Sequence, residues 1–279
     1  MVQKRRGAHR NAQGGGKKQI EALELKDDVL IRQNGNPTYF AGDIAYHYNK
    51  FAKRGFDRVI NVWGADHHGH VARLKGAMNA LGLDGSKLDV VLMQLVELMR
   101  DGKPVRMSKR TGKAITLTDL LEEVPIDAAR FFFNMREPNT HLIFDLDLAV
   151  EQSSQNPVYY VQYAHARICS ILRSLAEEGI TPAGEIPAGV LKEPEELALV
   201  SCIAAFPGEM KEAARLYDPA HITKYAVDIA SVFHKFYNAC RCRCDDEQLM
   251  QARIALCLAA KTTIKNVLTV LNISVPESM

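Results

Sequence analysis

Basic side chains crowd one short segment of the chain, DGKPVRMSKRTG, which spans residues 101–112. Lys103, Arg106, Lys109 and Arg110 stand there among Gly, Pro, Ser and Thr, so the positive charge is dense. Lysine beside a phosphate stabilises the negative charge that spreads over phosphoryl oxygens in a transition state. These residue types predict a loop that handles phosphate groups. The alternative is a solvated basic loop without a ligand.

The elements on either side of this loop determine where it would act. Residues 90–98 form a largely apolar, β-branched run of strand length, and residues 116–124 predict a helix opened by Thr116 and supported by Asp119. Loops at the carboxyl ends of parallel strands are where doubly wound sheets bind nucleotides. The order of strand, basic loop and helix therefore predicts a nucleotide site at the edge of a sheet.

A ring and a carboxylate stand four residues apart upstream of this loop. Residues 29–32 alternate like a short strand, turn residues follow, and the next segment contains Tyr39 and Asp43. On a helical turn this spacing places both side chains on one face. An aromatic ring can stack on a guanidinium group while a carboxylate accepts its N–H groups. The alternative is an ordinary helix start with Asp43 exposed and Tyr39 half-buried.

A second apolar run, residues 56–63, predicts a buried strand that ends at the sequence GADHHGH. Three histidines near an aspartate suggest a metal site, but ligands on adjacent residues usually point apart and no Cys or Glu cluster accompanies them. A strand end followed by glycine is instead typical of a ligand-binding edge, with Asp66 and His67 as candidates. The tract Cys240-Arg-Cys242-Arg-Cys244 lacks histidine, so we expect no protein-bound metal there either.

Length and composition indicate a globular protein of two domains. The chain has 279 residues, 47% of them hydrophobic, and contains no uninterrupted apolar run of about 18 residues. The basic start lacks the apolar stretch of a secretory signal, so we expect a cytoplasmic protein with reduced thiols.

Residues 1–18 hold six Lys or Arg within a net charge of only +2, so positive charge elsewhere must be local. We expect residues 1–26 to be a disordered basic tail, either a tail without a fold or an RNA-binding arm.

Helical periodicity dominates the second half of the chain. After Asp127, which we expect to cap a short apolar helix, residues 144–148 alternate like a strand. Four longer segments then carry apolar residues at three- and four-residue spacing, with turn residues between them: 156–178, 194–217 with a break at Pro207-Gly208, 219–240 and 247–271. This pattern predicts a helical bundle.

Several segments together resemble arginyl-tRNA synthetase, a class I aminoacyl-tRNA synthetase. RMSKR resembles the KMSKS signature, although Arg106 departs from its first lysine, and TYFAGDIAYH, WGADHHGH, YVQYAHAR, FHKFYN and the final VPESM resemble family segments in the family's order. The resemblance covers residues 28–279. It implies α/β then all-α architecture, with part of a Rossmann-like catalytic domain over residues 27–148 and a helical anticodon-binding domain over 149–279.

The resemblance also implies an activity and its residues. The family joins arginine to tRNA-Arg with ATP and Mg²⁺, through an arginyl adenylate. Lys109 would then stabilise the leaving pyrophosphate within an ATP-binding loop that includes Lys103, Arg106, Met107 and Ser108. Arginine would be bound by Tyr39, Asp43, Asp66 and His67. The anticodon would be bound by Tyr163, Arg167, Tyr237 and Asn238, because aromatic rings stack on splayed bases and arginine contacts phosphate.

The resemblance has one main departure. The HIGH motif, whose histidines contact ATP phosphates in this family, has no counterpart before residue 28, and the HHGH tract follows a later strand. We therefore expect impaired adenylate formation by this chain unless the missing portion is supplied in trans as a partner. A non-catalytic tRNA-binding module and a decayed gene product are the alternatives.

Overall fold

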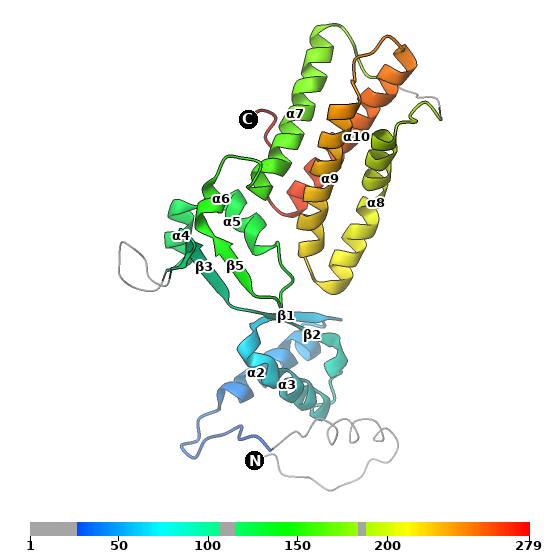
Figure 1. Ribbon diagram of the computed structural model, residues 1–279. Coiled ribbons are helices and arrows are strands. Elements are labelled where there is room, and N and C mark those ends of the chain that lie inside the picture. The colour runs from blue at the N-terminus through cyan, green and yellow to red at the C-terminus, as the bar shows by residue number, and fades with distance from the viewer. Residues whose placement is uncertain (1–26, 106–114, 184–187) are drawn as a thin grey trace. The chain divides into compact units, whose positions relative to one another are not determined.

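The computed structural model describes residues 27–105, 115–183 and 188–279 (Figure 1). The chain divides into two compact units, residues 1–95 and 96–279, and each is described by itself. None of the helices in the described ranges is long and apolar enough to cross a membrane.

The first unit is a pair of parallel strands packed against helices. Strands β1 (Val59–Gly64) and β2 (Leu88–Met93) pair in parallel, with Val59 opposite Leu88. The connection between them contains the 3-10 turn Ala65–His67, helix α3 (His68–Ala80) and a second 3-10 turn, Gly85–Lys87. Helix α2 (Tyr39–Tyr48) comes before β1 and continues into a π-helical turn, Asn49–Lys53.

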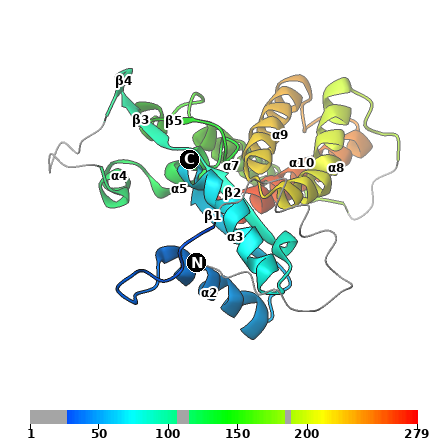
Figure 2. The ribbon, with the colours of Figure 1, turned by 90° about the horizontal axis from the view of Figure 1, so that it is seen from below.

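One face of the strand pair is buried by helices. Val59 and Leu88 from the strands pack with Leu74 and Met78 of α3. Figures 1 and 2 place α2 and α3 on the same side of the two strands. Because side chains alternate along a strand, Asn61 and Trp63 share the face of Val59 and point toward these helices.

The second unit begins with a small mixed sheet. Its strands β3 (Val96–Arg100), β4 (Lys103–Pro104) and β5 (Leu142–Asp145) lie in the order β4-β3-β5, antiparallel between β4 and β3 and parallel between β3 and β5. Three short helices accompany it: α4 (Leu117–Glu123), α5 (Ile126–Phe133) and α6 (Leu146–Val150). The predicted capping of α4 is confirmed, since Thr116 and Asp119 form a reciprocal capping box.

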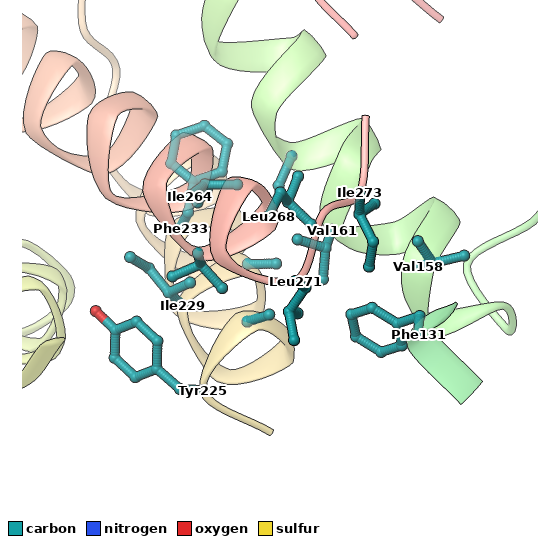
Figure 3. Packing of buried hydrophobic residues seen from close by; sticks show 14 of the residues in the cluster. Phe131, Val158, Val161, Tyr225, Ile229, Phe233, Ile264, Leu268, Leu271 and Ile273 are labelled. Carbon is teal, nitrogen blue, oxygen red and sulfur yellow. The ribbon is translucent and has the colours of Figure 1, made fainter. Parts of the chain in front are cut away.

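Four long helices form the predicted bundle: α7 (Pro157–Glu177), α8 (Pro194–Leu216), α9 (Ala220–Ala239) and α10 (Glu247–Val270). Figure 3 shows side chains of α7, α9 and α10 meeting in one apolar cluster, which Phe131 of α5 also joins. The bundle and the short helices before it therefore share one hydrophobic core. The predicted fold class, α/β followed by all-α, is confirmed.

A buried ion pair fastens α8 to α10 inside this bundle. Arg253 Nε donates to Glu196 Oε1 at 2.7 Å, and the Glu196 side chain is fully buried. Glu196 Oε2 also accepts the backbone N–H groups of Lys192 and Glu193 at the start of α8, while Arg253 donates to the carbonyl of Arg241. Both charged side chains thus have several hydrogen-bond partners, as burial of charge requires.

Two elements predicted before residue 100 were wrong in detail. The apolar run 90–98 is two strands of different sheets, because β2 pairs with β1 whereas β3 pairs with β4 and β5. No Gly, Pro or Asn interrupts the run, so its sequence carries no turn signal. Residues 29–32 form no strand and make only an isolated bridge between Ile31 and Pro37.

Further differences concern residues near the helix ends. Asp127 lies inside α5, whose cap position is Pro125, and its carboxylate instead accepts from Gln162 and Ser274. The alternating pattern of residues 144–148 is a strand end followed by α6, capped by Asp145. Helix α8 runs unbroken through Pro207, although an interior proline typically costs about 3 kcal/mol. Phe206 and Met210 on either side pack against the core and help to offset that cost.

Residues 1–26 lie outside the described residues. The predicted domain boundary between residues 148 and 149 stays a prediction, because the division of the structure at residues 95 and 96 reflects compactness of contacts alone.

Candidate functional site

A polar pocket of about 230 Å³ lies within the first unit. Four of its lining residues come from one stretch of helix, at positions 43, 46, 47 and 50, whose spacing places them on one face. The opposite wall comes from the strand β1 and the start of α3. The lining residues are Asp43, Tyr46, His47, Lys50, Asn61, Trp63, His67 and His70.

Local sequence explains how helix α2 presents that face. Thr38 is its N-cap, and the threonine hydroxyl oxygen accepts from the N–H of Ala41 at 3.3 Å. The helix then passes without a break into the π-helical turn that contains Lys50. Because the helix is continuous from Tyr39, Asp43 and His47, four residues apart, stay on the face that lies toward β1.

The floor of the pocket is a buried hydrogen-bond network. His47 is 3% exposed, and its Nδ1 donates to the carbonyl of Asp43 at 2.7 Å. The Asn61 amide nitrogen donates to His47 Nε2 at 2.8 Å, and Lys50 Nζ donates to Asn61 Oδ1 at 3.4 Å. Nδ1 is therefore a donor and Nε2 an acceptor, and this pair of roles requires the neutral His47 tautomer with its proton on Nδ1.

The Asp43 carboxylate stands at the side of the pocket. Its Oδ2 lies 3.0 Å from His70 Nε2, and its side chain is 46% exposed. The rings of Tyr46 and Trp63 also line the space. A half-exposed carboxylate beside aromatic rings suits a planar cation, which can hydrogen-bond to the oxygen and lie against a ring.

The structure brings together only some of the residues predicted for this site. Asp43 and His67 line the same pocket. Tyr39 is 90% exposed and Asp66 also points to solvent, 3.7 Å from His67 Nε2, and neither belongs to the lining. Their roles in binding arginine stay predictions.

Sequence reasoning missed most of the pocket wall. His47 and Lys50 continue the helical spacing of Asp43, so that periodicity was a usable signal for them. Asn61 and Trp63 alternate along a strand that was read only as buried. His70 could not be found this way, because its meeting with Asp43 depends on how α3 packs on α2.

Little of the predicted phosphate loop can be placed. Arg106, Met107, Ser108 and Lys109 lie outside the described residues, so their roles stay predictions. Lys103 is exposed on β4, opposite Arg100 of β3. Among the residues that are described, no group of three or more His, Cys, Asp or Glu side chains could hold a metal ion.

A second candidate site lies on the bundle. The guanidinium carbon of Arg167 on α7 is 4.9 Å from the centre of the Tyr163 ring and 4.7 Å from that of Tyr237 on α9. Arg167 also donates to the Tyr163 hydroxyl at 3.0 Å. Both rings are about one-third exposed, and together with the final residues 277–279 they line a pocket of about 280 Å³. Asn238 is exposed on α9.

His234 lies beneath this aromatic cluster and was not predicted. Its ring centre is 4.9 Å from that of Tyr160 and 6.0 Å from that of Tyr163, and neither ring nitrogen has a partner among the described residues. Burial, reinforced by the charge of Arg167, lowers the His234 pKa to about 4. The ring is therefore neutral near pH 7.

Comparison with known proteins identifies the family. Residues 161–279 match the DALR anticodon binding domain. The chain is 60% identical over 256 residues to an arginine–tRNA ligase of Caldanaerobacter subterraneus subsp. tengcongensis and 58% identical over 256 residues to that of Ruminiclostridium cellulolyticum. This chain belongs to the arginyl-tRNA synthetase family. These alignments cover 91% of this chain but 46% and 45% of the two relatives, so the chain spans about half their length.

Solved structures of the family agree in fold. A Campylobacter jejuni protein named as an arginyl-tRNA synthetase is 29% identical, with a TM-score of 0.79, and the match covers 95% of this chain and 62% of that one. Thermus thermophilus arginyl-tRNA synthetase, at 23% identity, has the same fold with a TM-score of 0.76 over 94% of this chain and 53% of the other. The pocket around Asp43 and the cluster around Arg167 thus lie in a class I synthetase fold with a helical anticodon-binding domain.

Proposed function

We propose that this chain is the arginine- and tRNA-binding part of an arginine–tRNA ligase. The reaction joins arginine to tRNA-Arg, with ATP converted to AMP and pyrophosphate through an arginyl adenylate. The observation that carries the proposal is the Asp43 carboxylate, half-exposed in a pocket with two aromatic rings, in a chain 60% identical to a known arginine–tRNA ligase. The pocket volume of about 230 Å³ suits one amino-acid side chain rather than a whole nucleotide.

In this proposal Asp43 accepts N–H groups of the arginine guanidinium, and Tyr39, Asp66 and His67 complete the arginine site. A guanidinium has five N–H donors in a fixed fork, whereas a lysine ammonium is a compact point charge. Preference for arginine over lysine would follow from that geometry.

ATP and its Mg²⁺ enter as substrate. We assign the contacts with the phosphates to Lys103, Arg106, Met107, Ser108 and Lys109, with Lys109 stabilising the charge on the leaving pyrophosphate. A lysine so placed acts on charge that develops in the transition state and therefore raises the rate more than the affinity.

The bundle would bind the anticodon of tRNA-Arg. Tyr163 and Tyr237 are each about one-third exposed, and Arg167 lies over both rings, so the cluster offers the aromatic rings and the cation that bind unpaired bases and phosphates. Asn238 would add a hydrogen bond from the same helix as Tyr237.

Arginine-dependent exchange of labelled pyrophosphate into ATP tests the enzymatic part. The printed sequence contains no His-x-Gly-His other than residues 67–70, and His70 is already bound to Asp43, so we propose that the 279-residue polypeptide alone forms the adenylate poorly. The expected result is weak exchange that requires arginine and is lost in Asp43→Asn. Asp84→Asn is the matched control, because Asp84 lies in the same unit and outside the pocket. Vigorous exchange would refute the impairment, and exchange supported by lysine would refute the specificity.

A non-catalytic tRNA-binding module is the second candidate. The observation that favours it is that the Arg167 cluster lies entirely within the region matched to the anticodon binding domain. Tight, salt-dependent binding of tRNA with no exchange and no arginine binding would support this function instead.

A further inference from the structure

Within the described part of the chain, only one oxygen of the Asp43 carboxylate has a hydrogen-bond partner. Oδ2 accepts from His70 Nε2 at 3.0 Å, whereas no hydrogen bond from the described residues reaches Oδ1. Because a carboxylate oxygen only accepts, the proton of this bond belongs to His70 Nε2. The imidazole can therefore be neutral and still hold the carboxylate, which keeps its negative charge for a ligand.

His70 is the fixed member of this pair. Its ring centre lies 5.2 Å from that of Phe40 in an edge-to-face contact and 5.4 Å from that of Trp63. The His70 side chain is 21% exposed, against 46% for Asp43. A ring packed between two others has little freedom, whereas a short, half-exposed carboxylate can rotate unless something holds it.

We propose that His70 is a positioning residue, which fixes the Asp43 carboxylate so that its free Oδ1 faces a guanidinium in the pocket. This inference rests on the proposed function and adds a residue to its arginine site. The pairing restricts the carboxylate before the ligand arrives, so less rotational freedom is lost on binding. It also leaves Oδ1 directed at the ligand, which favours a guanidinium group over an uncharged group of the same shape.

The experiment measures the dissociation constants of L-arginine and L-citrulline for the 279-residue polypeptide by calorimetric titration. Citrulline has nearly the shape of arginine but a neutral ureido group. His70→Phe keeps a flat ring between Phe40 and Trp63 but removes the N–H, and we expect it to weaken arginine binding about tenfold while citrulline binding changes little. His70→Gln, whose amide can donate in place of Nε2, should recover part of the loss.

Arg73→Gln is the matched control for a purely structural role. Arg73 is on the same helix, pairs with Asp28 and lies over the Phe40 ring, yet it does not line the pocket. It should lower thermal stability without changing the ratio of the arginine and citrulline constants. In the Asp43→Asn background, His70→Phe should have almost no further effect on arginine binding, because it acts through Asp43.

The outcomes separate the two proposals. If the wild-type polypeptide binds arginine no better than citrulline, the arginine pocket is refuted and the role of His70 with it. If the wild type discriminates and His70→Phe retains the same ratio, the positioning role alone is overturned. An additive effect of His70→Phe in the Asp43→Asn background would also overturn it.

Discussion

Removing Arg253 should destabilise the bundle far more than removing an exposed charge. The side chain of Glu196 is fully buried, and Arg253 is its only side-chain partner among the residues that the structure describes. In Arg253→Met the carboxylate keeps the amides of Lys192 and Glu193 but loses its counter-ion, and the Arg241 carbonyl loses a donor. Breaking a buried pair from one side costs about 3–5 kcal/mol.

We expect a loss of about 4 kcal/mol in the free energy of unfolding at neutral pH. For a unit of this size it corresponds to a fall of about 8–16 °C in Tm. Urea unfolding followed by far-UV circular dichroism measures it, since the signal is dominated by the helices. The double variant Glu196→Met/Arg253→Met buries no charge and should recover at least half of the loss.

The pH dependence gives an independent check of the cause. Burial alone would raise the Glu196 pKa, but the bonds from Arg253 and the two amides outweigh burial and lower it. In the wild type this stabilisation is present above the ordinary carboxyl pKa of 4.5 and is lost as pH falls through the lowered value. Without Arg253, burial raises the Glu196 pKa, so Glu196 becomes protonated more readily as pH falls. The loss in free energy of unfolding caused by Arg253→Met should therefore be smaller at about pH 5 than at about pH 8. If Arg253→Met loses less than about 1 kcal/mol of unfolding free energy, or loses the same amount at both pH values, this reasoning is refuted.

Three further predictions concern other parts of the structure. Because the folded-state pKa of His234 is lowered from 6.5 to about 4, the native state should lose stability as pH falls from about 6.5, and thermal melts of His234→Phe should lack that part of the pH dependence. A Cβ at Gly85 would lie 2.7 Å from the carbonyl oxygen of Lys75, so Gly85→Ala should cost about 1–3 kcal/mol in urea unfolding, whereas the control Gly42→Ala, at an exposed position inside helix α2, should cause no loss and stabilise by up to about 1 kcal/mol. Phe233 is completely buried in the core of Figure 3, and Phe233→Ala should cost about 3–5 kcal/mol, whereas a loss below about 1 kcal/mol would contradict its place there.

The helical bundle was predictable because each helix carries its own signals. Asn156 caps α7 and Pro157 begins it, and the apolar spacing fixes which faces are buried. The unbroken course of α8 was not predictable, since the local cost of Pro207 is visible in the sequence while the packing that offsets it is not.

The candidate pocket was predictable only where its residues share an element. Asp43 was found from its spacing to Tyr39, and the same periodicity extends to His47. The contact of Asp43 with His70 joins residues 27 positions apart, and it depends on the packing of two helices that no local pattern encodes. Similarly, the division of residues 90–98 between two sheets depends on the partners of each strand.

Binding of tRNA to the 279-residue polypeptide tests the central claim most directly. A tRNA-Arg transcript should bind at least about tenfold more tightly than the same transcript with its anticodon bases replaced, and Tyr237→Ala should reduce that preference, since stacking on one ring contributes about 1–3 kcal/mol per base. Equal affinity for the two transcripts, unchanged by Tyr237→Ala, would contradict the proposed recognition of tRNA-Arg by this bundle.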